Sequence, residues 1–372
     1  MPCPARPYRK EPAVTASRKD DHVRLALAQT PSTSASARAV PNGSPSPFDD
    51  VHLIHHALAG TDRTLIDLSS SFAGMHWPVP LYINAMTGGS PMTGEINRDL
   101  AIAGHETGLP VATGSMSPYL KDPDTADTFA TVRRHHPHGF IMANVNALAT
   151  PEQARRAVGL LEANALQIHI NAVQETVMPE GDRSFGSWPA SIEAIATAVA
   201  VPVIVKEVGF GLSGITVSQL ADLGVAVADV AGGGGTNFAA IENGRREQAD
   251  YSYLNSWGLS TPAALLDARG CGLPLLASGG IRHPLDVVRS LALGAHAAGV
   301  SAAFLATLQR DGLAPLISQI QQWLDQITAL MTVLGAHCPA EVSSCDVVLT
   351  GSLYDFARQR CLDIKTSTEE TA

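Results

Sequence analysis

From Pro80 to about residue 301 the sequence repeats one pattern, in which a short apolar run precedes a segment of helical length. Runs of Val, Ile, Leu and Ala with few polar residues are typical of parallel strands that helices cover on the outside. Eight such units over roughly 230 residues predict a (β/α)8 barrel, whereas a doubly wound sheet would give fewer units and a different kind of glycine-rich turn. The expected strands are residues 81–85, 111–114, 140–144, 165–171, 203–208, 227–231, 275–278 and 297–301.

Helix signals lie between these runs. Pro151 and Pro284 occupy first-turn positions, where the missing N–H costs no hydrogen bond. Gly108, Gly224 and Gly294 follow helical segments at positions that favour a left-handed C-cap. The expected helices are residues 95–106, 151–163, 191–199, 284–293 and 316–334.

The chain has 372 residues, and its hydrophobic content of 45% is enough for one large core. A stretch rich in Ser, Pro and Ala at residues 30–47 reads as a flexible linker. The predicted organisation is a disordered tail at 1–17, an arm, linker and lead-in segment at 18–79, the barrel at 80–360 and a C-terminal tail at 361–372.

Composition excludes several partners. The formal net charge of −10 argues against binding bulk nucleic acid, because a phosphate backbone requires an excess of Lys and Arg. Five scattered cysteines form no CxxC pair, which is typical of reduced thiols. No apolar stretch is long enough to span a bilayer, and no signal-peptide pattern opens the sequence. We therefore expect a cytoplasmic protein that binds neither nucleic acid nor membranes.

The fourth expected strand ends in a row of polar side chains. Strand alternation puts Gln167, His169 and Asn171 on one face. Each unpaired polar group in a buried strand costs about 1–3 kcal/mol, so the row suggests a face turned toward a ligand. The alternative is a polar strand end whose hydrogen bonds are satisfied within the protein. Gln174 and Glu175 follow at the carboxyl end of the strand, where a barrel keeps its active site.

The other strand ends are also rich in glycine. The turns after the seventh and eighth strands, at Gly279-Gly280 and Ser301, form the usual phosphate site of a barrel, made of backbone N–H groups. A third glycine-rich loop, at 232–235, is followed by the hydroxyl of Thr236. Together these loops favour a phosphorylated cofactor. Lys206 would place a positive charge against a ring that becomes anionic on reduction, as a flavin does.

Three further patterns carry less weight. Residues 209–214 match GxGxxG, but they follow the fifth strand and not the first strand of a Rossmann domain, so we discount them. Glu175 is the one candidate metal ligand, because Mg²⁺ often needs only one or two carboxylates beside substrate phosphates; a carboxylate at a helix start is the alternative. Arg18 and Lys19, near His22, would close onto a bound phosphate as a lid or form a solvated face.

Six motifs occur together: Arg18-Lys19-x-x-His22, Met86-Thr87-Gly88-Gly89, His169-x-Asn171-x-x-Gln174-Glu175, Gly234-Gly235-Thr236-Asn237, Ser278-Gly279-Gly280-Ile281-Arg282 and Thr350-Gly351-x-Leu353. In combination they resemble the type 2 isopentenyl-diphosphate isomerases. These are FMN-dependent barrels of isoprenoid biosynthesis that interconvert isopentenyl and dimethylallyl diphosphate. The similarity extends from Arg18 to about Arg360, nearly the whole chain.

The resemblance implies a role for each matching position. Gln174 and His169 would be the catalytic candidates, and Glu175 would hold Mg²⁺. NADPH would reduce the FMN, and the protein would form a homo-oligomer, a tetramer or an octamer. The implied substrate-binding residues are Arg18, Lys19, His22, Ser115, Met116, Ser117, Asn171 and Gln174. The implied FMN-binding residues are Ala85, Met86, Thr87, Ser115, Asn144, Lys206, Thr236, Gly279, Gly280, Ile281, Ser301 and Ala302.

Two positions depart from the family pattern. Many members have Ser-Gln-Arg where this chain has Ser115-Met116-Ser117, and many carry a basic residue in the glycine loop where this chain has Gly233. Both differences remove positive charge. They therefore bear on substrate affinity more than on the fold or the cofactor.

Isomerisation requires one proton to be added to the terminal alkene carbon and another to be removed two carbons away. Gln174 is not an acid and Glu175 is expected to hold metal, which leaves reduced FMN as acid and base by elimination, with His169 as the protein alternative. Two other functions stay open. One is an FMN-dependent 2-hydroxy-acid oxidase, for which Arg282-His283 is the nearest Arg–His pair. The other is a non-catalytic binder of prenyl diphosphate or flavin.

Overall fold

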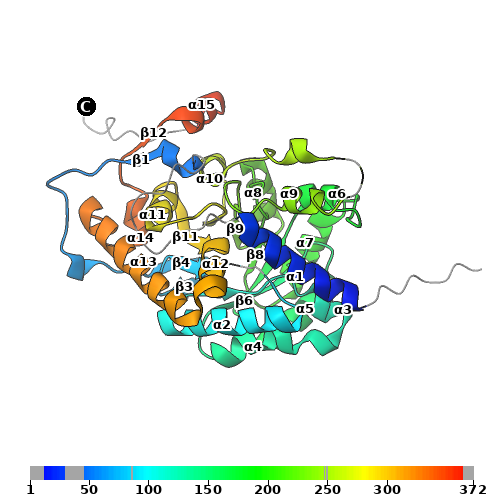
Figure 1. Ribbon diagram of the computed structural model, residues 1–372. Coiled ribbons are helices and arrows are strands. Elements are labelled where there is room, and N and C mark those ends of the chain that lie inside the picture. Colours follow the sequence, from blue (N-terminus) through cyan, green and yellow to red (C-terminus); the bar gives the residue numbers. More distant parts are fainter. Residues whose placement is uncertain (1–11, 30–45, 85–86, 247, 249, 363–372) are drawn as a thin grey trace, which may run out of the picture.

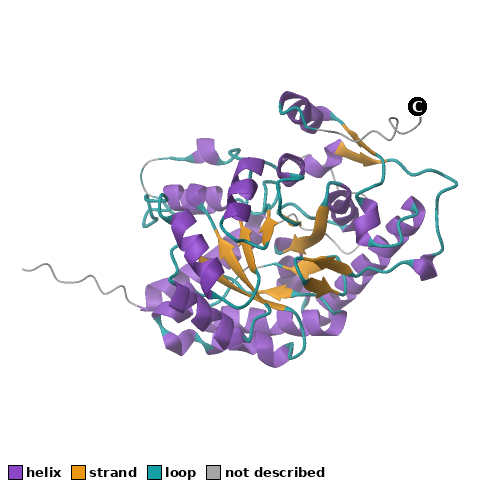
Figure 2. Ribbon diagram, turned by 180° about the vertical axis from the view of Figure 1, so that it is seen from behind, coloured by secondary structure: helices purple, strands orange, loops and turns teal. Residues whose placement is uncertain are grey.

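Eight parallel strands close into a barrel with helices on its outside (Figures 1 and 2). The structure is a computed structural model that describes residues 12–29, 46–84, 87–246, 248 and 250–362. Neighbouring strands follow chain order, and the last pairs with the first to complete the circle. The predicted (β/α)8 barrel is therefore confirmed. Its strands are β4 (Leu81–Ile83), β5 (Val111–Ala112), β6 (Ile141–Asn146), β7 (Ala165–His169), β8 (Val203–Lys206), β9 (Val227–Asp229), β10 (Leu275–Ser278) and β11 (Ala295–Val300).

The helices begin where the sequence supplies caps. Thr150 accepts the N–H of Gln153, whose side chain accepts the Thr150 N–H in return, a capping box that starts the helix at Pro151. Gly108 ends the preceding long helix in the left-handed conformation, with φ 72°. The helices are α2 (Pro91–Thr107), α3 (Ser117–Lys121), α4 (Asp127–His135), α5 (Pro151–Leu161), α6 (Ala172–Val177), α7 (Trp188–Ala198), α8 (Gly214–Asp222), α9 (Phe238–Asn243), α10 (Thr261–Ala268), α11 (Pro284–Ala292), α12 (Ala302–Asp311), α13 (Leu313–Leu334) and α14 (Pro339–Val342).

The amino-terminal end of the barrel is closed by an apolar plug. The hairpin of β2 (Ser70–Phe72) and β3 (Met75–Trp77) lies against this end. The Trp77 ring packs 5.3 Å from the Tyr82 ring and 5.4 Å from the Phe140 ring, centroid to centroid. This cluster is separate from the main core, which lies between the strands and the helices. The barrel interior is consequently dry at its base, and its polar side chains lie toward the opposite end.

A small sheet and a final helix lie outside the barrel. Strand β1 (Val51–Leu53) pairs antiparallel with β12 (Val347–Leu349), and α15 (Gly351–Gln359) projects beyond them (Figure 1). The Asp50 carboxylate accepts the N–H of Leu353 at 3.2 Å and so holds the first turn of this helix. A Cβ at Gly351 would lie 2.4 Å from Asp50 Oδ1, which explains the glycine of the Thr350-Gly351-x-Leu353 motif. Four 3₁₀ turns complete the described part: Pro47–Asp50, Arg63–Leu65, Pro123–Thr125 and Ser252–Leu254.

The N-terminal helix α1 (Pro12–Gln29) begins earlier than the sequence predicted. Residues 12–17 were expected in a disordered tail, but they form the first turns of this helix. Its first residue is a proline, which is tolerated there, and two alanines in the next turn favour the helix. Figure 1 shows α1 lying over the barrel, and it contacts α2, α9 and α12. Residues 1–11 lie outside the described part, as do most of the linker and the C-terminal tail from 363.

The cysteines at 271, 338, 345 and 361 form no disulfides. Among the described helices, none is both long enough and apolar enough to cross a bilayer.

The buried imidazole of His136 predicts an acid-sensitive step in stability. Its Nε2 contacts the carbonyl oxygen of Leu109 at 3.2 Å, and its Nδ1 has no hydrogen-bond partner in the described structure. Burial lowers the pKa of His136 to about 4. An unfolded histidine has a pKa of about 6.5. Between pH 6.5 and 4 the unfolded chain therefore binds more protons than the folded chain, and the free energy of unfolding should decrease as the pH is lowered through this range.

We expect His136→Phe to reduce the loss of unfolding free energy between pH 7.5 and pH 5, measured by urea titration at both values. The exposed His55 supplies the control, because His55→Gln should leave the wild-type difference in place. A His136→Phe variant that loses as much stability as the wild type would contradict this assignment.

Candidate active site

The polar side chains of β6 and β7 meet inside the barrel near its carboxyl end. Asn144 donates to Gln167 Oε1 at 3.0 Å, and Gln167 donates to Asn84 Oδ1 at 3.4 Å. Nδ1 of His169 lies 2.8 Å from Asn144 Oδ1. Gln167 and His169 thus share the inner face, as predicted. For Gln167 the correct interpretation is a polar residue whose hydrogen bonds are satisfied within the protein, and not one turned toward a ligand.

A second polar cluster follows directly after β7. Asn171 donates to both Gln174 Oε1 and Glu175 Oε1, each at 3.1 Å. The Gln174 amide nitrogen donates in turn to Glu242 Oε1 at 3.0 Å. Glu175 Oε2 also accepts the N–H of Asp182 at 2.8 Å. The structure therefore brings the three predicted residues together and fixes the orientation of the Gln174 amide at both ends.

Glu242 is a site residue that the sequence analysis missed. It lies on α9, is fully buried, and forms an ion pair with Arg245. Arg245 also pairs with Glu180 at 3.0 Å, so the carboxylate belongs to a charge network between α6 and α9. One signal was present in the sequence: a single acidic residue follows Phe-Ala-Ala-Ile just after the glycine loop. A charge in such an apolar helix needs a buried partner.

Several features at this end of the barrel fit a flavin. The hydroxyl of Thr87 is buried without a hydrogen-bond partner in the described structure, and so is that of Thr113. Such orphaned donors are rare in proteins, and a polar ligand is one explanation. Lys206 is also buried, and its Nζ donates to the carbonyl oxygen of Glu207 at 2.6 Å. Burial lowers the pKa of Lys206, while the carboxylate of Asp229 raises it.

The glycine turns after β9 and β10 pack backbone against backbone. Gly279 and Gly280 have φ values of 90° and 76°, which other residues rarely adopt. A Cβ at Gly279 would lie 2.0 Å from the Gly232 oxygen, and one at Gly235 would lie 2.7 Å from the Gly280 nitrogen. On the next strand, Ser301 leads into the ten-residue helix α12. A phosphate at this edge would meet backbone N–H groups and a helix N-terminus.

Residues 124–348 match the family of FMN-dependent dehydrogenases. The isopentenyl-diphosphate delta-isomerase of Streptomyces sp. (strain CL190) is 58% identical over 358 residues, 96% of each chain. The enzyme of that name from Kitasatospora griseola is 59% identical over 94% of each chain, and that of Lacticaseibacillus paracasei 45% over 93% of this chain and 97% of its own. The chain belongs to the isopentenyl-diphosphate delta-isomerase family.

Solved structures add information about the fold of this isomerase. A mandelate oxidase with (S)-2-phenylpropionate has a TM-score of 0.61 at 17% identity, covering 89% of this chain and 98% of its own. A flavocytochrome b2 variant with sulfite bound has a TM-score of 0.59 at 19% identity, covering 87% of this chain and 79% of its own. At such low identity the likeness supports the barrel fold alone.

The GxGxxG match of the isomerase has a structural explanation. The Glu207 carboxylate accepts the N–H of Val208 at 2.6 Å and that of Phe210 at 2.5 Å. The N–H of Gly209 donates to the carbonyl of Ala231 at 2.9 Å. Burial raises the pKa of Glu207 to about 7, against the opposing effect of these N–H groups. The turn already supplies its own acceptors, so a dinucleotide phosphate is not needed to explain the motif.

The two positions that depart from the family pattern lie in different surroundings. Met116 is fully buried in the main core, and only its neighbours Ser115 and Ser117 keep half-buried hydroxyls, 3.0 Å apart. The predicted contact of Met116 with substrate is thus not favoured by the position of its side chain. Gly233 is half-buried, and its own loop at 232–235 consists of glycines and therefore carries no charged side chain.

The remaining predicted residues are placed as follows. Thr236 and Ser301 are half-buried at the ends of their loops, whereas Asn144 and Ile281 are buried. Gly279, Gly280 and Ala302 line the same edge, each half-buried. Ala85 and Met86 lie outside the described residues, and the side chains of Arg18, Lys19 and His22 are likewise outside, although their backbone belongs to α1.

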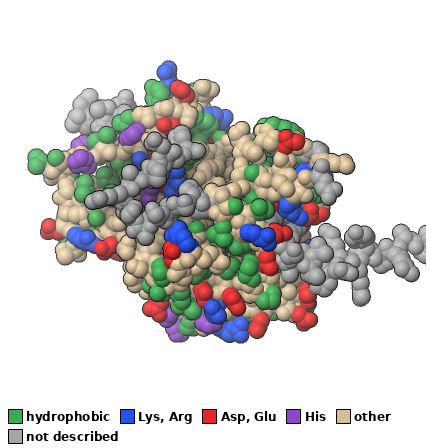
Figure 3. All heavy atoms as spheres, viewed as in Figure 1, with side chains coloured by type: hydrophobic (Ala, Val, Ile, Leu, Met, Phe, Trp, Pro, Cys, Tyr) green, Lys and Arg blue, Asp and Glu red, His purple; other side chains and the backbone are tan. Residues whose placement is uncertain are grey.

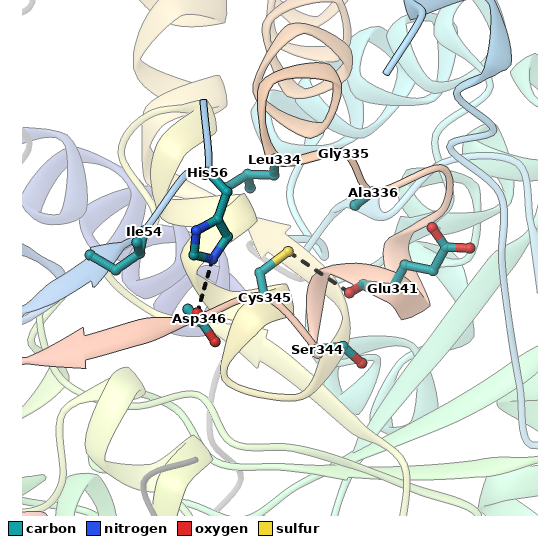
Figure 4. Close-up of a pocket in the computed structure, with 9 residues that line it drawn as sticks. All are labelled: Ile54, His56, Leu334, Gly335, Ala336, Glu341, Ser344, Cys345 and Asp346. Atoms are coloured by element: carbon teal, nitrogen blue, oxygen red, sulfur yellow. Dashed lines mark hydrogen bonds and ion pairs between the residues drawn. The ribbon is translucent and has the colours of Figure 1, made fainter. Parts of the chain in front are cut away.

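A cavity of about 340 Å³ lies away from these residues, between β1, β12 and the end of α13 (Figure 4). His56 Nε2 contacts Asp346 Oδ2 at 3.0 Å on its wall. Burial raises the pKa of Cys345, and the Asp346 and Glu341 carboxylates add to the effect, so this thiol is a poor nucleophile.

In the described chain no three His, Cys, Asp or Glu residues gather at metal-binding distance. On the face shown in Figure 3, acidic and basic side chains are interspersed, without a large basic patch.

Two contacts hold α1 over the carboxyl end of the barrel. Ser90, which caps α2, donates to Asp20 Oδ1 at 2.6 Å. Gln29 exchanges two hydrogen bonds with the backbone of Asn237, which caps α9, at 2.8 and 3.3 Å. Helices that follow barrel strands begin at the mouth, so both contacts place α1 across it.

We expect Asp20→Ala to loosen α1 without unfolding the barrel. A hydrogen bond to a charged group contributes about 1.5–3 kcal/mol, so amide exchange in residues 12–29 should accelerate by roughly tenfold or more. Hydrogen exchange followed by mass spectrometry measures this. Asp21→Ala is the matched control, because in the described part of the chain Asp21 pairs with the exposed Arg24 of its own helix. Equal exchange in the two variants would show that the contact with Ser90 does not hold α1.

Proposed function

We propose that the enzyme interconverts isopentenyl diphosphate and dimethylallyl diphosphate, using reduced FMN bound at the mouth of the barrel. The observation that carries the proposal is the cluster of Asn171, Gln174 and Glu175, which stands at the mouth in a chain 42–59% identical to enzymes of that name. Reduced FMN, when bound, supplies groups that can give and take a proton beside the substrate.

The residues proposed to hold FMN surround that position. Thr87 would use its orphaned hydroxyl, and Lys206 would place its positive charge near the ring. The glycine turns and the start of α12 would bind the phosphate through N–H groups. The full proposed set is Ala85, Met86, Thr87, Ser115, Asn144, Lys206, Thr236, Gly279, Gly280, Ile281, Ser301 and Ala302.

His169 and Gln174 would position the alkene rather than protonate it. The amide nitrogen of Asn144 faces Gln167, so its oxygen faces His169, and the neutral imidazole carries its proton on Nδ1. Nε2 of that tautomer is an acceptor. Gln174 has no acidic proton and is held between Asn171 and Glu242. Gln174 is not a general acid, and the Nδ1–H of His169 is bound to Asn144, which supports assigning proton transfer to the cofactor.

Glu175 is the proposed Mg²⁺ ligand. Each of its oxygens accepts one hydrogen bond, from Asn171 and from the Asp182 N–H, and each retains a lone pair for a cation. A single carboxylate cannot bind Mg²⁺ by itself, so the diphosphate and water would complete the coordination. Arg18, Lys19 and His22 on α1, with the hydroxyls of Ser115 and Ser117, would bind the same diphosphate.

Three further features of the proposal follow from family resemblance. NADPH would reduce the FMN. The enzyme would assemble as a homo-oligomer, a tetramer or an octamer. It would act in the cytoplasm, in isoprenoid biosynthesis.

The redox state of the flavin separates this proposal from an oxidase. Isomerisation changes no net oxidation state, so we expect activity on isopentenyl diphosphate with Mg²⁺ only after anaerobic reduction by NADPH or dithionite. No reductant should be consumed per turnover. Product is measured by chromatography in matched oxidised and reduced samples. Equal rates in both would return the proton transfer to His169, and flavin reduction by a 2-hydroxy acid with oxygen uptake would favour the oxidase.

Removal of the charge on Glu175 tests the metal site. Glu175→Gln keeps an acceptor for Asn171 but loses the carboxylate, so we expect the dependence of kcat/KM on Mg²⁺ to disappear and kcat/KM to fall by at least tenfold, about 1.4 kcal/mol in transition-state binding. A Mg²⁺ titration of the initial rate measures both. The exposed Glu193 provides a charge-matched control, since Glu193→Gln should titrate like the wild type. Full wild-type activity after exhaustive chelation would rule out the metal.

A further inference from the structure

The barrel contains a buried carboxylate that the proposed chemistry does not use. Asp229 ends β9, has no exposed surface, and is the register partner of Lys206, which ends β8. Register partners on neighbouring parallel strands direct their side chains to the same side of the sheet. The structure thus places one negative and one positive side chain on adjacent strands inside the barrel, both removed from water, close enough for electrostatic attraction but without a direct ion pair between these two described residues.

The Asp229 carboxylate is held from three strands. Oδ2 accepts the hydroxyl of Tyr82 on β4 at 2.6 Å and the amide of Asn84, the residue directly after β4, at 3.4 Å. Oδ1 accepts the hydroxyl of Ser278 at 2.8 Å and the N–H of Ala231 at 3.2 Å. Each oxygen therefore has an N–H donor and a hydroxyl donor. Such a donor set stabilises an ionised carboxylate and fixes its position.

We propose that Asp229 is a positioning residue that keeps Lys206 charged and directed toward the barrel mouth, as its buried counter-charge. A lone ammonium in this place would lose its proton, because burial disfavours the charged form. A lone carboxylate would gain one for the same reason. Each charge offsets the cost of burying the other, and the hydrogen bonds from Tyr82 and Ser278 anchor the carboxylate to β4 across the barrel and to the neighbouring strand β10.

Two other titratable groups lie close to Lys206, and the Glu207 charge also raises the pKa of Lys206, although less than the Asp229 charge does. Glu207 supplies a carbonyl oxygen to Nζ, while its carboxylate faces the N–H groups of Val208 and Phe210. His169 is the Lys206 partner on β7, and its Nδ1 contacts Asn144. Burial raises the pKa of Asp229 and the Lys206 charge lowers it, which agrees with mutual compensation.

The consequence for the cofactor rests on the proposed function. If FMN binds at the mouth with Lys206 beside its ring, Asp229 controls the charge that the ring meets. Loss of the Asp229 charge would then weaken FMN binding as much as loss of Lys206 itself. The electrostatic pairing of the two side chains does not depend on FMN, so it can be tested separately.

The chain has only five lysines, which makes the Lys206 amine observable by NMR of ε-¹³C-labelled lysine in the full-length protein, with its FMN and after FMN removal. Lys206→Met identifies the signal. In Asp229→Asn we expect the titration midpoint of Lys206 to fall by about one to three pH units. Tyr82→Phe and Ser278→Ala each remove one hydrogen bond but keep the carboxylate, so each should shift the midpoint less than Asp229→Asn does. An unchanged midpoint in Asp229→Asn overturns the proposal, whether or not FMN binds.

Two further measurements keep the proposal testable if Asp229→Asn folds poorly. The double variant Lys206→Met with Asp229→Asn should be more stable to urea than the sum of the single variants predicts, because it buries neither charge alone. Strict additivity would overturn the pairing. FMN affinity, measured by equilibrium dialysis, should fall by a similar factor in either single variant and no further in the double. Tight FMN binding in all three variants, with a shifted Lys206 midpoint, would support the pairing and displace only the proposed position of the flavin.

Discussion

A buried charge needs a partner, and the organisation of this barrel depends on where that requirement is met. The lower interior is filled by aromatic and aliphatic side chains and sealed by the β2–β3 hairpin. Above it, amide, hydroxyl and charged groups from successive strands satisfy one another, from Ser278 and Asp229 through Asn84 to His169. The apolar layer excludes water from the amino-terminal end of the barrel. Polar groups can therefore meet a ligand only at the mouth, where the site residues lie.

Close packing of loop backbones shapes the other half of the site. The turns after β9 and β10 approach so closely that a single Cβ at Gly279 would overlap the Gly232 carbonyl. Side chains are excluded from this edge by geometry, so backbone N–H groups are what this edge would offer a phosphate. The same loop ends at Asn237, which caps α9 and exchanges two hydrogen bonds with Gln29 of α1. The glycine turns that would bind a phosphate, helix α9 and helix α1 are consequently connected through this one loop.

Much of this arrangement follows from local sequence, and the rest does not. All eight strands could be predicted because apolar runs and their spacing are local signals, and the barrel then brought His169, Asn171, Gln174 and Glu175 to one end. Glu242 was missed because its partner Gln174 lies on another unit, 68 residues away along the chain. Burial of Met116 and the early start of α1 depend in the same way on packing between elements, which residue pattern alone does not encode.

The likeness to mandelate oxidase raises the question of why the oxidase interpretation of the sequence is not favoured. That chemistry requires an Arg and a His free to face a carboxylate, and Arg282-His283 is the candidate pair. In the structure both side chains lie near the buried Asp286, with nitrogen–oxygen distances of 3.9 and 3.7 Å. Arg289 approaches the same carboxylate at 3.2 Å from one turn further along α11. The pair thus belongs to an ion cluster at the start of a helix. Shared barrel geometry therefore does not imply shared chemistry, which we propose depends here on the polar groups that follow β7.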